Sequence, residues 1–264
     1  MRLRFRFSKL GKVRFTSQRD VARMWERALR RAELPLAYTE GFSPRPQLGF
    51  GLALPTACES LAEYVDVVLD DTRPETASVD VDALPARLSG LLPDGIEVQQ
   101  AIVVERRATS LQQEVTLCSW TMSFRGVDRQ ELTTRVASLL AASEVTITRE
   151  RKGRQVEDDL RPSVLSLIVV DGPDDATGTV ELTAELATQP RGVRPVELVR
   201  GLMAVAPPSA SVDGGPADAV GVPVLDRACR TNQWIERDGD RSEPVALRAV
   251  RSDASAGCGL ERAS

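Results

Sequence analysis

The chain has 264 residues, 42% of them hydrophobic, and its 34 Lys or Arg against 38 Asp or Glu give a formal net charge of −4. This length suggests one or two domains with a hydrophobic core of ordinary size. The sequence contains no histidine, which excludes Ser-His-Asp and Cys-His nucleophile systems and histidine-ligated metals within the chain.

The charge is unevenly distributed along the chain. Residues 1–50 carry twelve Arg or Lys and four Asp or Glu, a balance of +8, whereas residues 51–264 carry 22 against 34, a balance of −12. A segregated basic region can attract phosphate-rich partners even on an acidic protein. The same arginines are equally consistent with a solvated face that offsets acidic neighbours.

The first elements are read from the spacing of apolar residues. "RLRFRFSK" alternates, which predicts a strand at 2–9 with Leu3, Phe5 and Phe7 on a buried face. Ser17 and Asp20 have capping-box spacing, and helical spacing then predicts a helix at about 18–32. The other side of this helix carries five arginines: Arg19, Arg23, Arg27, Arg30 and Arg31.

The rest of the chain predicts two similar halves. Strands are expected in "LPLAYTE", "QLGFGLALP", "AEYVDVVLD" and "GIEVQQAIVV", with a helix in "VDALPARLSGLL". The order is strand, helix, two or three strands, helix and strand. A similar order recurs from 114, with strands expected in "EVTITRER", "SVLSLIVV" and "GTVELTAEL" before a last helix, whose first turn Pro195 suits. The fold prediction is α+β, two tandem ferredoxin-like (βαββαβ) units with antiparallel sheets, at 1–105 and 112–205. Residues 206–264 are expected to be mostly disordered, apart from a candidate added strand at 222–236.

Other compartments and cofactors are not indicated. The longest apolar runs, such as "VLSLIVV", fall far short of the eighteen or so residues that cross a bilayer, so we expect a cytoplasmic protein. No C-x-x-C spacing occurs, and we predict no metal site, no cofactor and free thiols at all four cysteines: Cys58, Cys118, Cys229 and Cys258.

The segment "GFSPRPQLGFGLALP" (41–55) has a strand face that is almost bare of side chains. Period two places Gly49, Gly51 and Ala53 together, which indicates either close packing against protein or an exposed binding surface. The G-x-G is not followed by a helix, so it does not predict a dinucleotide site.

The arginines of the first predicted strand suggest a second surface. If helices cover one sheet face, Arg2, Arg4 and Arg6 would form a basic stripe on the open face. Sheet faces of this kind bind RNA, but the aromatic content of 4% favours phosphate contacts over base stacking. The alternative is that these arginines pair with acidic neighbours.

The segment "RERKGRQVEDDLRP" (149–162) joins basic and acidic clusters. We interpret it as a surface loop between strands. Its three acids are a weak signal for a cation such as magnesium, because consecutive carboxylates lack a defined ligand spacing.

Two stretches resemble a bacterial radical SAM-associated domain family of unknown function. The first runs from 13 to 69 and includes "VRFTSQRD" and "GFSPRPQLGFGLALP"; the second is "KGRQVEDDLRP" (152–162). The resemblance spans roughly 1–205 and implies a role in RNA or ribosome metabolism beside a radical SAM protein. The C-x-x-x-C-x-x-C motif is absent, so the chain is at most the partner of the radical enzyme.

The chain departs from the family pattern at two positions. Gln18 and Arg45 stand where relatives usually have histidines. If those histidines are catalytic or bind metal in relatives, this chain has lost that activity. If they bind phosphate or shape the loop, Gln18 and Arg45 can still serve.

The sequence therefore predicts a non-catalytic accessory module that binds the phosphate backbone of tRNA, ribosomal RNA or messenger RNA. One alternative is an RNA-processing or RNA-modifying enzyme that uses Asp20, Tyr38 and Arg45; another is a protein-binding scaffold for a radical SAM protein. The residues predicted to contact RNA are Arg2, Arg4, Arg6, Arg19, Arg23, Arg27, Arg30, Arg31, Arg45, Gly49, Gly51, Lys152 and Arg161.

Overall fold

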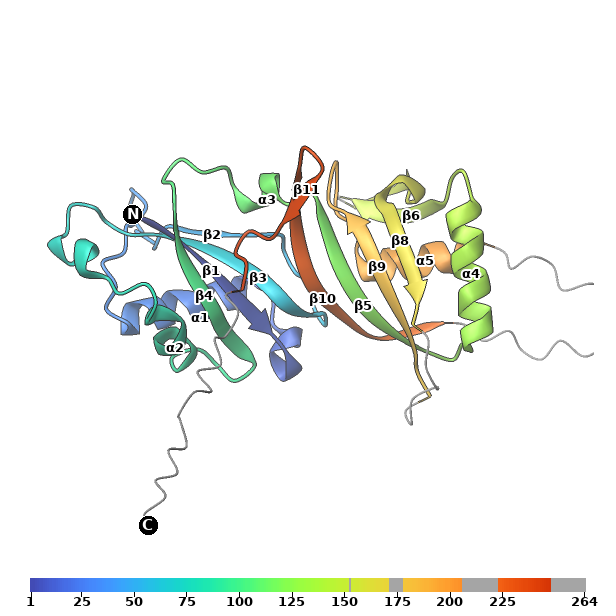
Figure 1. Cartoon of the computed structure of the whole chain (residues 1–264), viewed down its shortest axis with the longest axis horizontal. Helices are drawn as coiled ribbons and strands as arrows, with labels where there is room; N and C mark the ends of the chain where they lie inside the picture. Colours follow the sequence, from blue (N-terminus) through green and yellow to red (C-terminus); the bar gives the residue numbers. More distant parts are fainter. Residues whose placement is uncertain (152, 171–177, 206–222, 248–264) are drawn as a thin grey trace, which may run out of the picture.

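The computed structural model describes residues 1–151, 153–170, 178–205 and 223–247. Within these ranges, one nine-stranded mixed sheet runs the length of the molecule in the order β4-β1-β3-β10-β5-β9-β8, with β2 paired to β3 and β11 to β10 (Figure 1). The strands are β1 (Arg2–Lys9), β2 (Leu48–Phe50), β3 (Glu59–Val68), β4 (Ile96–Val104), β5 (Leu117–Arg125), β8 (Val164–Val169), β9 (Val180–Ala187), β10 (Val224–Arg237) and β11 (Asp240–Ser242).

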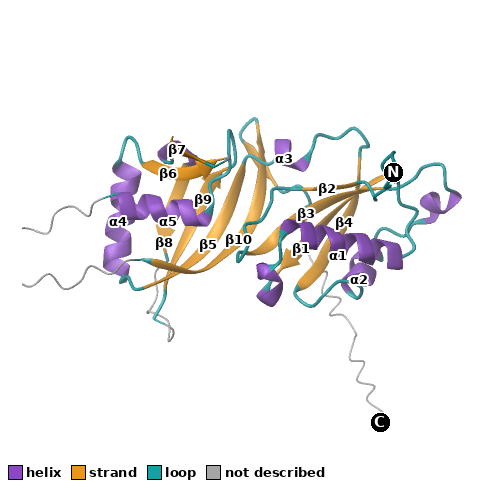
Figure 2. Cartoon of the chain, turned by 180° about the vertical axis from the view of Figure 1, so that it is seen from behind, coloured by secondary structure: helices purple, strands orange, loops and turns teal. Residues whose placement is uncertain are grey.

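The longer helices pack on one face of this sheet and at its β8 end. Figure 2 shows α1 (Gln18–Arg31) and α2 (Leu84–Ser89) in front of the first half and α5 (Pro195–Ala204) in front of the second, with α4 (Arg129–Ala141) beside β8 at the outer end of the sheet. The short helix α3 (Leu111–Glu114) lies between the halves in sequence, and 3-10 turns occupy η1 (Gly11–Phe15), η2 (Pro74–Ser78) and η3 (Arg161–Ser163). In the described ranges, no helix combines the length and apolar character that crossing a bilayer requires.

The predicted first strand and first helix are confirmed. Phe5 and Phe7 of β1 point to the helix face, where their rings lie 5.6 and 5.1 Å from the ring of Trp25 in α1. The Ser17 hydroxyl accepts a hydrogen bond from the backbone N–H of Asp20, as the capping spacing predicts. Alternation in β1 and helical spacing in α1 therefore build one shared core.

The α+β class is also confirmed, but the expectation of purely antiparallel sheets is wrong. β10 pairs with β5 antiparallel along most of its length and with β3 in parallel at Cys229 and Arg230, so it joins both halves into one sheet. Counted along the chain, both halves have the strand order fourth, first, third, second: β4-β1-β3-β2 and β10-β5-β9-β8. β10 lies at the candidate strand of the expected tail, while 206–222 and 248–264 of that tail lie outside the described residues.

Two local predictions also need correction. "LPLAYTE" forms isolated bridges at Leu36 and Tyr38 instead of a strand. The segment at 149–162, interpreted as a loop, belongs to a hairpin of β6 (Thr146–Arg151) and β7 (Arg154–Asp159). Gly153 at its turn has a φ of +75°, a left-handed conformation that glycine adopts without strain.

Candidate nucleic-acid interface

The outer side of α1 is a row of exposed arginines, here called the α1 face: Arg19, Arg23, Arg27, Arg30 and Arg31. The two acids of the helix approach this face only loosely, with Asp20 3.5 Å from Arg23 and Glu26 3.8 Å from Arg30. Ion pairs as exposed as these contribute little. Within the described ranges, the other three arginines have no ion-pair partner, so the α1 face keeps a net positive charge.

Arg45 lies on a small loop beside α1. The backbone of this loop is closed by the N–H of Thr39 donating to the Arg45 carbonyl at 2.9 Å and by the N–H of Arg45 donating to the Thr39 hydroxyl at 3.1 Å. Arg45 and Gly49 line a hollow of about 510 Å³ that Ala22 of α1 also lines. The fold therefore brings the predicted contacts Arg45 and Gly49 next to α1.

Two of the predicted catalytic residues, Asp20 and Tyr38, form hydrogen bonds that hold the local backbone in place. Asp20 accepts a hydrogen bond from the Ser17 hydroxyl at 2.7 Å, and this bond lowers the pKa of the carboxyl. Tyr38 is 42% exposed, and its carbonyl accepts a hydrogen bond from the Gln47 amide. These contacts build a helix cap and a loop, and they supply no argument for catalysis.

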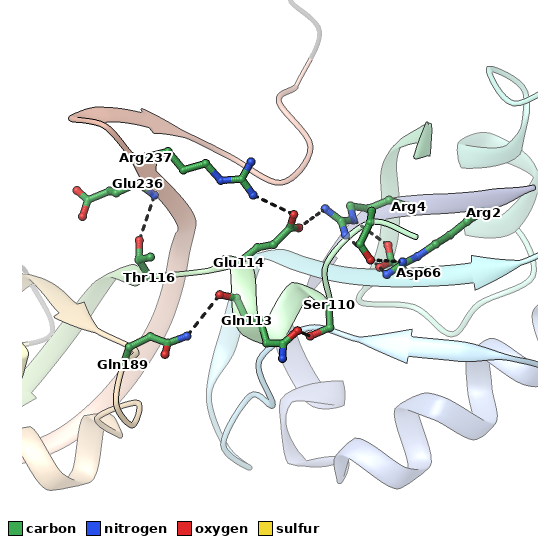
Figure 3. Close-up of polar contacts among 11 residues, drawn as sticks. Arg2, Arg4, Asp66, Ser110, Gln113, Glu114, Thr116, Gln189, Glu236 and Arg237 are labelled. Carbon is green, nitrogen blue, oxygen red and sulfur yellow. Dashed lines mark hydrogen bonds and ion pairs between the residues drawn. The ribbon is translucent and has the colours of Figure 1, made fainter. Parts of the chain in front are cut away.

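The arginines of β1 are not the open basic stripe that their alternation suggested. Arg4 is only 4% exposed, and its Nε donates to Asp66 at 2.8 Å while Nη1 donates to Glu114 at 2.9 Å (Figure 3). Arg2 also pairs with Asp66, and Arg237 of β10 reaches Glu114 from the other side. The second reading of these arginines, pairing with acidic neighbours, is therefore the one observed.

Arg6 is buried in the same way. Its Nη1 donates to the Tyr64 hydroxyl at 3.1 Å and pairs with Glu243, and burial raises the pKa of Tyr64. Leu111 of α3 and Val245 pack against Tyr64 on this face. The sheet face opposite α1 is therefore covered at Tyr64 by α3 and by the segment around Val245, which are distant from β1 in sequence.

Gly51 belongs to this closed face as well. A Cβ at this position would lie 3.7 Å from the Leu111 Cβ and 3.5 Å from the Tyr64 carbonyl oxygen. Of the two readings of the bare strand face, close packing of protein therefore applies at Gly51, whereas Gly49 remains exposed. Gly51 was predicted to contact RNA, but in the structure it is packed against protein.

The second motif is mainly structural. Arg161 donates from Nε and Nη2 to the Leu140 carbonyl near the end of α4, at 3.2 and 3.0 Å, and from Nη1 to the Val164 carbonyl at 2.9 Å. Asp159 accepts from the N–H groups of Val145 and Arg161. Arg161 is thus a cap and not a free cation, while Lys152 lies outside the described residues.

A further basic group surrounds the start of α5, here called the α5 cluster: Arg149, Arg191, Arg194 and Arg200. These side chains line a pocket of about 390 Å³. Asp158 pairs with both Arg149 and Arg191, and Glu197, which also lines the pocket, pairs with Arg191, whereas Arg194 and Arg200 are exposed. The sequence reading did not select this group for RNA binding. In the sequence, the α5 cluster is indicated only by the arginine spacing in "RGVRPVELVR". Arg149 joins the cluster because the β6–β7 hairpin places it beside α5.

The fold and these surfaces define an α+β protein with one mixed sheet and a basic helix face. The family model described as "Uncharacterized protein conserved in bacteria (DUF2344)" matches residues 2–195, and the chain belongs to this family. No curated protein matches the chain.

One solved structure similar to this chain is described as "Crystal Structure of a Cbf5-Nop10-Gar1 Complex". The two chains share 9% identity with a TM-score of 0.45, and the match covers 87% of this chain and 49% of the other. This chain thus matches about half the length of that chain. At this TM-score the likeness carries no argument about function.

Proposed function

We propose that this protein binds the phosphate backbone of RNA through the α1 face and Arg45, as a non-catalytic accessory module. The observation that carries the proposal is the contrast between two sets of arginines. Arg4 and Arg6 of β1 are buried in ion pairs, whereas the arginines of α1 remain exposed with two loose acid contacts. An exposed set of cations on one helix is available to phosphates.

The geometry of α1 suits a linear polyanion. Residues one turn apart on a helix rise by about 5.4 Å, so Arg23, Arg27 and Arg31 present a cation at each successive turn. Arg45 extends this row across the hollow beside α1. Guanidinium groups bind phosphate oxygens in pairs of hydrogen bonds, which favours arginine at such a surface.

The wider context follows from the motifs. The resemblance to a radical SAM-associated family supports tRNA, ribosomal RNA or messenger RNA as the bound molecule and a radical SAM protein as the partner. We further propose that the two halves are tandem ferredoxin-like units joined through β10, because both have the same strand order. Co-purification with a radical SAM protein in the absence of RNA would favour the scaffold alternative.

The salt dependence of RNA binding tests the proposal. Each phosphate contact to single-stranded RNA contributes about −0.7 to the slope of log affinity against log salt. Replacing Arg23, Arg27 and Arg31 by Gln should therefore weaken binding at low salt and reduce the slope by about 2.

A charge-matched control separates local contacts from net charge. Arg73, Arg107 and Arg125 are exposed and lie outside α1, so replacing these three by Gln removes the same charge elsewhere. The control should bind almost as the unmodified protein does. Equal losses in both triple variants, or no RNA binding at low salt, would refute the proposal.

A further inference from the structure

A pocket of about 660 Å³ lies on the helix face where the two halves of the molecule meet, and we call it the junction pocket. The first half contributes Gln18 and Leu54, the second contributes Trp120 and Arg194, and β10 contributes Arg230. Pockets of this size that are mainly apolar, with a few converging polar groups, are typical ligand sites.

A buried cation forms part of its lining. Arg230 is 2% exposed, donates to Glu63 at 2.6 Å and to the Leu52 carbonyl at 2.8 Å, and its guanidinium carbon lies 5.6 Å from the Trp120 ring centroid. These contacts hold the guanidinium in one position. The guanidinium is therefore a fixed part of the pocket wall, paired with Glu63 and lying over the Trp120 ring.

A second buried basic side chain, Lys9, lies near Arg230 but does not line the junction pocket. Lys9 is also 2% exposed, and its ammonium donates to the Thr16 carbonyl at 2.9 Å. Burial lowers the pKa of Lys9, and Glu63 opposes this effect while Arg230 adds to it.

The junction pocket adjoins both basic surfaces. Gln18 is the first residue of α1, which carries the α1 face, and Arg194 lines both this pocket and the pocket of the α5 cluster. An RNA strand that contacts both surfaces would cross this pocket.

We propose that the junction pocket takes one unpaired nucleotide of the bound RNA. Its base packs against the apolar wall that includes Leu54 and Val193, and its phosphate lies at Arg194. The Gln18 amide offers the base edge a donor and an acceptor, and the Thr188 hydroxyl, which donates to the Val115 carbonyl, offers an acceptor. This inference rests on the proposed function, because the strand must first be held by the α1 face.

The test compares two RNAs and two variants by fluorescence anisotropy. One RNA is a short labelled single strand, and the other has the same backbone with abasic positions. Gly192 lines the pocket, and a Cβ added there meets open space, so Gly192→Trp places an indole at the mouth without disturbing the core. Leu165→Trp adds the same group at an exposed position of β8. Circular dichroism verifies that both variants fold.

The unmodified protein and Leu165→Trp should bind the intact RNA about tenfold more tightly than the abasic RNA, as expected when one base is buried against the apolar wall of the pocket. Gly192→Trp should lose this preference and keep its affinity for the abasic RNA. Equal binding of both RNAs by the unmodified protein would overturn the inference while leaving the proposed function intact. Failure to bind either RNA at low salt would overturn both.

Discussion

The Arg230–Glu63 pair allows a quantitative prediction about stability. Both side chains are buried, and Arg230 donates from Nε and Nη2 to one Glu63 oxygen at 3.1 and 2.6 Å. Glu63→Leu leaves the guanidinium buried without a carboxylate, among neutral groups such as the Leu52 carbonyl, the Trp120 ring and the Cys118 thiol. Breaking one side of a buried ion pair costs 3–5 kcal/mol, so we expect a loss of about 4 kcal/mol in the free energy of unfolding.

Urea denaturation with a double-mutant cycle measures this effect. Glu63→Leu/Arg230→Met removes both charges and should recover most of the loss, because an apolar pair of similar volume often replaces a buried ion pair without cost. The control is Glu185→Leu, which breaks the exposed pair with Arg241 and should cost less than about 1 kcal/mol. If Glu63→Leu costs no more than Glu185→Leu, the reasoning from burial is wrong.

Three further predictions concern single positions. Arg161→Met should lower the free energy of unfolding by about 1–2 kcal/mol because it uncaps the end of α4, whereas Arg154→Met on the exposed hairpin should have almost no effect in the same urea assay. Gly95→Ala should cost more than about 1 kcal/mol by thermal unfolding, because Gly95 has a φ of +91° and an added Cβ would collide with the Leu10 carbonyl oxygen; an unchanged melting temperature would contradict this. Burial alone would raise the pKa of Glu59, but hydrogen bonds from the Gly11 N–H and from arginines outweigh it and lower the pKa. Its stabilisation is therefore complete above the unfolded pKa of about 4.3 and is lost as the pH falls through the lower folded value, so Glu59→Gln should flatten the acid limb of the stability curve.

The candidate site could be predicted only in part. The capping spacing at Ser17 and the helical periodicity located the α1 arginines and their exposed side correctly. The α5 cluster and the junction pocket were missed, because both depend on contacts between segments far apart in the chain. Arg194 and Gln18 are separated by 176 positions in sequence but line one pocket.

The sequence by itself determined the local elements and a basic N-terminal region without histidine. Alternation and helical spacing reflect backbone geometry, which acts over a few residues and can be read directly. Tertiary structure alone decided which arginines stay available to a ligand. Arg4 and Arg6 alternate just as residues on an open face would, yet Glu114 and Glu243, more than a hundred positions away, neutralise them. The charge of a surface depends on which distant segments fold across it, and local periodicity gives no information about those segments.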